Sequence, residues 1–593
     1  MKQLMTGDEA IARGAYEAGV RHASAYPGTP STEILENLAT YEEIYAEWAP
    51  NEKVAMESAI GAAIAGARSM VSMKHVGVNV AADPLFTWAY MGVNAGNVLI
   101  SADDPGMFSS QNEQDNRNYA KSAKLAMFEP SDSQECIDMV KAAYELSESY
   151  DTPVMIRMTT RVCHSKSIVE TGERVEAPVK TWENNPAKYV CLPAISRKLR
   201  VKLQARMEKL AEYSEISPFN RVEMNDTKIG VIASGICYYY AKEVFEEKAS
   251  YLKLGFTNPM PAGLVKDFCD KMDVVYILEE NDPYSEEFVK RQGVTCELHG
   301  KDIFPYTLEM TPDVIRKSVY GEALKSIDFD KNKLINRAPT FCAGCPHRGL
   351  FYRLGKRKDI MVSGDIGCYT LAAGKPYSAL NSTICMGASF SVAHGAQKVM
   401  NLSASGKRVV GVLGDSTFFH TGINSLMNTV YNQSNTVNII LDNRITGMTG
   451  HQDNPGTGFT AKGTPAPILN IEEIVRAIGI KHVKVINPNN LKEVDEALDE
   501  CLALDEPSVI ITRWPCVLKQ FSQADKTEFE NLFKTKNQVE EEKCIGCKAC
   551  LKTGCPAMSY DAAAKKVRIN QASCVGCDVC AQVCPKDAIV KVD

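Results

Sequence analysis

The stretch Val409–Gln452 reads VVGVLGDSTFFHTGINSLMNTVYNQSNTVNIILDNRITGMTGHQ and decides how this part of the chain folds. VVGVL and VNIIL are short apolar runs, which predicts two buried strands. The segment between them has helical character through Asn428, so the stretch predicts a βαβ unit with neighbouring parallel strands. Asp415 and Asn443 follow the two strands. We therefore expect them side by side at the carboxyl edge of the sheet, where ligands bind in open α/β folds.

Oxygen donors at this edge indicate a magnesium site. The Asp415 carboxylate, the Asn443 amide oxygen and nearby backbone carbonyls suit Mg²⁺, which prefers to be completed by phosphate oxygens. The TGMTG turn that follows, with Gly447 and Thr449, offers backbone N–H groups to such phosphates. The alternative is an ordinary βαβ turn, because Gly-Asp pairs at strand ends are common.

The same residues resemble the thiamine diphosphate signature, in which a Gly-Asp pair is followed nearly thirty residues later by Asn. Here the signature runs from Gly414-Asp415 to Asn443. The resemblance implies that these residues bind Mg²⁺ and the cofactor, and that Ile445 gives its carbonyl to the metal. Ser416 stands where the family usually has Gly, which is a mild departure.

Composition narrows the class of protein. At 593 residues the chain predicts about four domains, and its net charge of −7 is modest. There is no basic stretch interleaved with aromatic residues, so nucleic acid is not an expected partner. No apolar run reaches membrane-spanning length and the first residues lack a signal-peptide core, so we expect a cytoplasmic protein without a membrane partner. Twenty cysteines in such a chain favour metal ligation over disulfides.

The last fifty residues contain eight cysteines in two runs, C-x₂-C-x₂-C-x₄-C-P and C-x₂-C-x₂-C-x₃-C-P. In two-cluster bacterial ferredoxins the fourth cysteine of each run ligates the other cluster. The pattern predicts two [4Fe–4S] clusters, one held by Cys544, Cys547, Cys550 and Cys584, the other by Cys574, Cys577, Cys580 and Cys555. Zinc is the alternative, but two x₂-spaced triplets followed by Cys-Pro would be unusual for it. The first run has one extra residue, through Gly554.

Near the start, HASAYPGTP predicts a strand that breaks into a helix, with Thr29 as its cap and Pro30 at its first position. KVAME predicts a short strand that delivers Glu57 to the start of a helix built of Gly and Ala. The ordinary interpretation of Thr29 is a cap only, and that of Glu57 is a partner of the helix dipole.

YPGTPS, and Glu57 followed by Gly and Ala at helical spacing, are similar to the pyrimidine-binding domain of the 2-oxoacid:ferredoxin oxidoreductases. The resemblance implies that Glu57 contacts N1′ of the aminopyrimidine, where a shared proton favours the imino tautomer that activates the cofactor. Thr29 is expected to meet a ligand at the strand end. Arg117, in the following loop SADDPGMFSSQNEQDNR, is a candidate for the substrate carboxylate; the alternative is a solvated surface arginine.

Four further cysteines, in CAGCPHR, SGDIGC and RWPC, resemble those of the pyrophosphate-binding domain in the same family. They are Cys342, Cys345, Cys368 and Cys516. The resemblance implies a third [4Fe–4S] cluster as first electron acceptor. The alternative is packing, because free cysteine is among the most buried residue types. The family typically reads MTGGQ where this chain has MTGHQ, so His451 departs.

The chain as a whole predicts a multidomain α/β protein with two thiamine-binding, doubly wound parallel-sheet domains, a transketolase C-terminal-like α/β domain and a two-cluster ferredoxin domain. The expected ranges are 1–179 (pyrimidine-binding), 180–225 (linker), 226–304 (transketolase C-terminal-like), 305–336 (linker), 337–534 (pyrophosphate- and Mg²⁺-binding) and 535–593 (ferredoxin).

This order of domains, with CAGCPHR and GDSTFFHTG, is most similar to the α subunits of indolepyruvate ferredoxin oxidoreductases. The resemblance implies oxidative decarboxylation of aryl 2-oxo acids, with CoA accepting the acyl group and external ferredoxin accepting electrons. It also implies a smaller β subunit, in a heterodimer or an α2β2 assembly; the chain itself shows no convincing CoA site. The alternatives are the same reaction on pyruvate or a branched-chain 2-oxo acid, a non-oxidative thiamine-dependent decarboxylase or carboligase, and a pure electron-transfer subunit.

Overall fold

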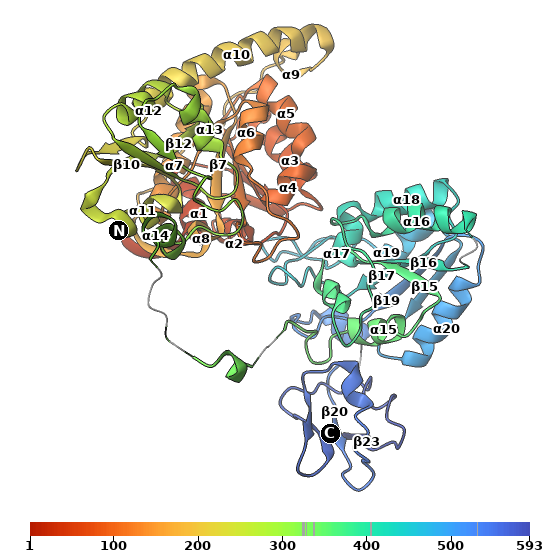
Figure 1. Cartoon of the computed structure of the whole chain (residues 1–593). Helices are drawn as coiled ribbons and strands as arrows, with labels where there is room; N and C mark the ends of the chain where they lie inside the picture. The colour runs from red at the N-terminus through yellow and green to blue at the C-terminus, as the bar shows by residue number, and fades with distance from the viewer. Residues whose placement is uncertain (323–326, 328, 336–337, 404–405, 530–531, 593) are drawn as a thin grey trace. The chain divides into compact units, whose positions relative to one another are not determined.

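The computed structural model describes residues 1–322, 327, 329–335, 338–403, 406–529 and 532–592. The chain divides into two compact units, Met1–Phe329 and Asp330–Asp593 (Figure 1). Residue 337, the expected first residue of the pyrophosphate-binding domain, lies outside the described residues. None of the helices in the described ranges is long and apolar enough to cross a membrane.

A seven-stranded sheet forms the centre of the first unit, in the order β12-β6-β7-β5-β4-β2-β3. Its strands are parallel except β12, which pairs antiparallel with β6. Their bounds are β2 (His22–Ala25), β3 (Tyr45–Trp48), β4 (Ser69–Lys74), β5 (Asn97–Asp103), β6 (Ala126–Phe128), β7 (Val154–Thr159) and β12 (Phe256–Asn258).

Helices cover both faces of this sheet. On β5, Val98 and Ile100 pack into a core shared with α1 (Gly7–Glu17) and α7 (Ser133–Tyr150). Leu99 points to the other face and packs with α3 (Glu52–Ala65) and α5 (Ala82–Met91). Alternate side chains thus face opposite layers, as a doubly wound fold requires, and the predicted fold class is confirmed for this half.

A second sheet of the first unit has the order β14-β13-β10-β11-β9. Its strands are β9 (Arg221–Glu223), β10 (Ile229–Ser234), β11 (Ser250–Leu254), β13 (Val274–Leu278) and β14 (Glu297–His299). The segment before it contains the long helix α10 (Pro193–Ile216), and β12 leaves this part of the chain to join the first sheet. The domain boundaries inferred from the sequence remain predictions.

The second unit contains a five-stranded parallel sheet in the order β15-β16-β17-β19-β18. Its strands are β15 (Ile360–Ser363), β16 (Arg408–Gly414), β17 (Val437–Asp442), β18 (His482–Ile486) and β19 (Ser508–Arg513). β16 and β17 are parallel neighbours, joined through α17 (Asp415–Thr417), a π-helical turn at Phe418–Gly422 and α18 (Ile423–Tyr431). The predicted βαβ unit is therefore confirmed. The π-helical turn begins at Phe418, shortly after the candidate metal ligand Asp415, and such turns often occur at functional sites.

The C-terminal segment is small and built from two antiparallel strand pairs. β20 (Lys536–Val539) pairs with β23 (Ile589–Val592), and β21 (Met558–Asp561) pairs with β22 (Lys566–Ile569). Six residues form its buried centre, and half of them are cysteines: Cys544, Cys550, Val567, Cys580, Ala588 and Ile589. So small an apolar core is typical of domains that depend on bound metal for stability.

Two local predictions near the N-terminus are wrong. KVAME is helical, because α3 begins at Glu52 behind the N-cap Asn51, whose side chain accepts the Val54 N–H. Glu57 therefore lies within the helix and not at its start. The helix after YPGTP, α2 (Thr32–Leu38), begins two residues later than predicted and has Ser31 as its N-cap residue; the Thr29–Pro30 peptide is cis.

Candidate functional site

The carboxyl ends of β16 and β17 bring three oxygens together. The side-chain amide of Asn443 lies with one terminal atom 3.2 Å from Oδ1 of Asp415 and 2.8 Å from the carbonyl oxygen of Ile445. With the amide oxygen in that position, all three atoms are acceptors and only a cation satisfies them; with the nitrogen there, the amide donates to both. The donor set is the one expected for Mg²⁺, and the residues fit the metal.

Asp415 is almost fully buried, at 3% exposure. Burial raises the pKa of Asp415 to about 7, and the neighbouring Asp442 adds to the rise. A divalent cation beside the carboxyl group favours its ionised form and offsets this cost. The electrostatics of the site thus agree with its donor geometry.

Polar side chains surround this oxygen cluster. The Thr446 hydroxyl donates to the Ser416 hydroxyl at 3.0 Å, and the Thr449 hydroxyl donates to Oε1 of Gln452 at 2.5 Å. Gly414 donates its N–H to the Tyr369 hydroxyl at 3.1 Å. The loop that was predicted to hold the diphosphate is therefore held against α17 by the bond between Thr446 and Ser416.

Asp365 was missed by the sequence analysis. It follows β15 and accepts N–H groups from Gly387 at 2.9 Å and Ser389 at 2.8 Å, where α16 (Ser389–Leu402) begins. Burial raises the pKa of Asp365 to about 7. SGDIGC repeats the strand-Gly-Asp order of VLGDS, and this second Gly-Asp pair is the signal that identifies Asp365 as a structural element of the same sheet edge.

The four cysteines predicted to hold a third cluster are neighbours in the fold. Burial raises the pKa of Cys368 to about 11, and the charges of Cys516 and Cys342 add to the rise. Burial likewise raises the pKa of Cys345, with Cys516 and Cys368 contributing. Three separate segments therefore bring these thiols together.

This cysteine group also adjoins the oxygen cluster. The N–H of Cys516 donates to the backbone carbonyl of Asn443 at 3.0 Å. A methyl group placed on Gly447 would lie 3.9 Å from Sγ of Cys368 and 3.8 Å from the Asn443 amide. His451 places Nε2 3.8 Å from Sγ of Cys516, and its φ of +71° explains why glycine is usual there.

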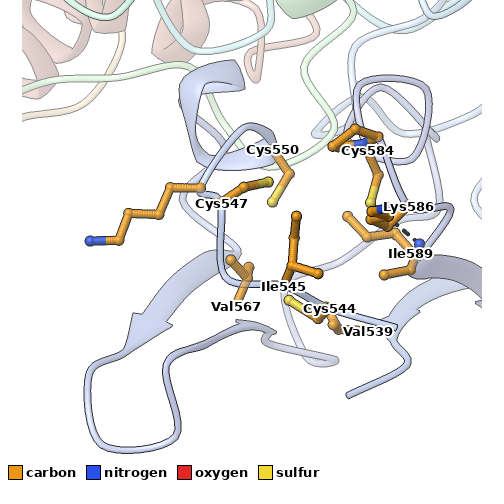
Figure 2. A pocket seen from close by; sticks show the side chains of 12 residues that line it. Val539, Cys544, Ile545, Cys547, Cys550, Val567, Cys584, Lys586 and Ile589 are labelled. Carbon is orange, nitrogen blue, oxygen red and sulfur yellow. Dashed lines mark hydrogen bonds between the residues drawn. The ribbon is translucent and has the colours of Figure 1, made fainter. Parts of the chain in front are cut away.

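The eight C-terminal cysteines segregate as their spacing predicts. Cys544, Cys547, Cys550 and Cys584 line one pocket with Val539, Ile545, Val567 and Ile589 (Figure 2). In the other group, burial raises the pKa of Cys580, and Cys577, Cys555 and Cys574 all contribute to the rise. N–H groups reach the sulfurs of both groups: Ala588 donates to Cys584 and Asn537 to Cys574, each at 3.3 Å. Such bonds are a common means of tuning iron–sulfur centres.

The second C-terminal group, which we call the Cys555 group, faces the CAGCPHR segment. Its members are Cys555, Cys574, Cys577 and Cys580. Arg348, at the start of α15 (His347–Leu354), donates to the carbonyls of Cys342 at 2.7 Å and Thr553 at 2.9 Å. The Tyr377 hydroxyl donates to the same Thr553 carbonyl at 2.8 Å. A methyl group on Gly344 would clash with the side chain of Val575 at 2.0 Å. The group that contains Cys342 and the group that contains Cys555 are thus joined by direct packing.

Glu57 does not have the environment that its predicted role requires. Its side chain is 47% exposed and pairs with Lys53 on the outer face of α3. Glu52, one and a half turns earlier, is 6% exposed, and a methyl group on Gly77 would come within 2.9 Å of its Oε1. A carboxylic acid that shares a proton with a buried ring nitrogen needs the position of Glu52.

The structure agrees with the predicted position of Thr29 but not with the predicted role of Arg117. Thr29 does lie at the carboxyl edge of β2, where its carbonyl accepts the Ser109 hydroxyl at 3.1 Å. Arg117 begins α6 (Arg117–Ala123) and is fully buried, so the solvated-surface alternative is wrong. Its guanidinium is paired with Asp115 at 2.5 Å and Glu279 at 2.8 Å, which does not support direct contact with a substrate carboxylate.

Three family models match the chain. Residues 13–209 match the thiamine diphosphate-binding domain of pyruvate flavodoxin/ferredoxin oxidoreductases. Residues 365–512 match the C-terminal TPP-binding domain of thiamine pyrophosphate enzymes. Residues 537–591 match the 4Fe-4S dicluster domain. Both thiamine-binding domains and the two-cluster module predicted from the sequence are confirmed.

Curated relatives match over nearly the whole chain. An indolepyruvate oxidoreductase subunit IorA from Archaeoglobus fulgidus is 41% identical, covering 99% of this chain and 97% of its own. The subunit IorA from Pyrococcus horikoshii is also 41% identical, over 100% of this chain and 97% of its own. A 2-oxoglutarate synthase subunit KorA from Methanothermobacter thermautotrophicus is 31% identical over 29% of this chain and 48% of its own.

Proposed function

The chain belongs to the family of indolepyruvate oxidoreductase subunits IorA, and we propose that it oxidatively decarboxylates aryl 2-oxo acids such as indolepyruvate and phenylpyruvate. The acyl group passes to CoA, and the electrons pass to external ferredoxin. Membership of this family supports the reaction class, which is oxidative decarboxylation of 2-oxo acids by an iron–sulfur thiamine enzyme. The aryl preference and the CoA acceptor are the proposal's own.

One observation supports the proposal most: a single loop joins the oxygen cluster to the cysteine group. Asn443 contributes its side chain to the first and accepts the Cys516 N–H from the second. A non-oxidative decarboxylase needs the Mg²⁺ ligands but has no use for adjoining cysteines. An electron-transfer subunit needs the cysteines but not the ligands.

Thiamine diphosphate, when bound, supplies the acidic C2 carbon and the electron sink that decarboxylation of a 2-oxo acid requires. In our proposal Asp415, Asn443 and the Ile445 carbonyl bind the Mg²⁺ that holds the diphosphate, with Gly414, Ser416, Gly447 and Thr449 around it. Glu52 holds the proton at N1′ of the aminopyrimidine, in the place first assigned to Glu57. Thr29 lies at the carboxyl edge of the first sheet, which in this proposal is the reacting edge.

Three groups of cysteines would hold the iron–sulfur clusters that carry electrons away from the cofactor. Cys342, Cys345, Cys368 and Cys516 hold a third [4Fe–4S] cluster beside the cofactor. The Cys555 group would hold the next cluster, and Arg348 joins its segment to CAGCPHR. The group of Cys544, Cys547, Cys550 and Cys584 is last, and its exposed Cys547 suits transfer to external ferredoxin.

A smaller β subunit completes the enzyme in this proposal, as a heterodimer or an α2β2 assembly. The test is an anaerobic assay of the chain with its partner, using CoA, a viologen acceptor and a panel of 2-oxo acids. We expect aryl 2-oxo acids to have the highest kcat/KM. Preference for pyruvate or a branched-chain acid would replace the substrate assignment, and CoA-independent release of aldehyde without viologen reduction would contradict the oxidative reaction.

A further inference from the structure

Lys74 ends β4 at the carboxyl edge of the first sheet, beside the loop that follows β2. Its aliphatic stem packs over Gly28, where an added methyl group would meet Cγ and Cδ at 3.1 Å. Its Nζ donates to the Ser109 carbonyl at 2.9 Å, and Ser109 in turn donates its hydroxyl to the Thr29 carbonyl. The ammonium group therefore lies among the residues of the predicted reacting edge.

The other cationic groups at this edge are already paired. Arg157, on β7, bonds Asp103 at 2.9 Å and Glu129 at 3.0 Å, and Arg117 is similarly enclosed by carboxylates. His75 follows Lys74 directly, and burial lowers the pKa of its imidazole. By contrast, within the described ranges Lys74 forms no ion pair, and one carbonyl accounts for only one of its three donors.

The surroundings of Lys74 favour a single negative charge. Burial lowers the pKa of Lys74 to about 8, while the charges of Asp104 and Glu52 raise it. Asp104 lies on the loop after β5, and Glu52 lies on α3. A partly buried ammonium gains from an anionic partner, but two flanking acids oppose a polyanion. The several phosphates of CoA would need more cations than this edge offers.

We propose that Lys74 binds the carboxylate of the 2-oxo acid substrate, the role that the sequence suggested for Arg117. The inference rests on the proposed function, because it requires the first sheet to present the reacting edge. Lys74 then fixes the carboxylate within the group of Thr29 and Glu52, and Arg117 acts as a positioning residue that ties its loop to Glu279.

The test compares Lys74→Met with Lys74→Arg in the complete enzyme with its partner subunit. Lys53→Met is the matched control, since Lys53 is a partly exposed lysine of the same unit. We expect Lys74→Met to raise KM for the 2-oxo acid roughly 10–100-fold, the usual effect of one hydrogen bond to a charged group. Lys74→Arg should recover part of the loss, and KM for CoA, thiamine content and iron–sulfur absorbance should not change.

A second measurement does not depend on turnover. The carboxylic acid that lacks the 2-oxo group should compete with substrate in the wild-type enzyme, and its inhibition constant should rise in Lys74→Met as much as KM does. In the wild type, this affinity should weaken as pH rises through about 8, where Lys74 loses its proton.

The outcomes separate this inference from the function on which it rests. Unchanged KM and inhibition constant in a thiamine-loaded Lys74→Met enzyme would overturn the role of Lys74. An increase in KM for CoA alone would overturn it too, in favour of a phosphate contact. A wild-type enzyme that turns over no 2-oxo acid would instead remove the proposed function.

Discussion

The two thiamine-binding regions differ in how closely their local sequence determines the position of a functional side chain. In the second unit, Asp415 and Asn443 follow two parallel neighbouring strands, so the topology alone brings them to one edge. In the first unit, the candidate acid lies on a helix, where a shift of five residues turns a buried carboxylate into an exposed one. Parallel strands all end at the same edge of their sheet, whereas successive residues of a helix point to different faces.

The largest expected effect is in the second unit. Asp415→Ala removes a metal ligand, and we expect at least a 100-fold loss of thiamine diphosphate affinity, since even outer-shell changes at metal sites cost 10–100-fold. Iron–sulfur absorbance should remain, because the pocket of Cys544, Cys547, Cys550 and Cys584 is lined only by residues of the C-terminal segment. Thiamine content and visible spectra of the purified chain measure both. Asp505→Ala, on the surface of the same unit, is the control, and normal thiamine content in Asp415→Ala would contradict the site.

The next prediction tests the first unit. Glu52→Gln should lower the rate of C2 proton exchange on bound thiamine by 10²–10⁴-fold, because general acid–base catalysis typically contributes that much. Glu57→Gln changes the same group on the exposed face of the same helix and should leave the rate within a factor of two. Proton exchange is measured by NMR on the bound cofactor. The opposite ranking would restore the first assignment of Glu57.

Helical periodicity explains why Glu52 was missed and also how it is recognisable. The buried side of α3 carries Glu52, Ala55, Met56, Ala59, Ile60 and Ala63, at spacings of three and four. Glu57 falls outside that pattern, and Asn51 marks the helix start. The segment was interpreted as a strand because it is short and apolar. Arg117 posed a different difficulty, since its partner Glu279 is distant in sequence and only the folded chain brings them together.

Cysteine spacing belongs with the predictable features, because a cluster fixes its ligands at short intervals. The eight C-terminal cysteines segregate as C-x₂-C-x₂-C geometry requires. The third group is different, since its members come from three segments and only Cys342 and Cys345 are close in sequence. The fold brings them together, and the cluster itself remains a prediction.

Iron content tests that third group. Cys342→Ser should remove about four irons per chain from anaerobically purified protein, because a [4Fe–4S] cluster that loses one thiolate is usually lost. Cys385→Ser is the matched control, as Cys385 is an exposed cysteine of the same unit outside the group. The spectrum of the two C-terminal clusters should persist in both variants. Equal iron in both would leave the four cysteines as packing residues.

The smallest expected effect concerns His451. It lies beside Cys516 and therefore links the loop after β17, which carries the predicted metal ligands (the metal loop), to the third cysteine group. A nitrogen that donates to a cluster sulfur stabilises the reduced, more negative state. His451→Gly should therefore lower the potential of the third cluster by about 20–65 mV, the equivalent of a hydrogen bond worth about 0.5–1.5 kcal/mol. Glycine adopts the positive φ of this position without strain, so the variant should fold at least as well.

Redox titration followed by electron paramagnetic resonance measures the shift. His394→Gly is no suitable control because it lies within α16, whereas His482→Ala changes a half-buried histidine at the start of β18, at the opposite edge of the sheet, and should leave all potentials unchanged. A potential that stays fixed in His451→Gly would mean that this histidine only fills the space beside Cys516, and that the metal loop and the cysteine group are joined through the backbone of Asn443 alone.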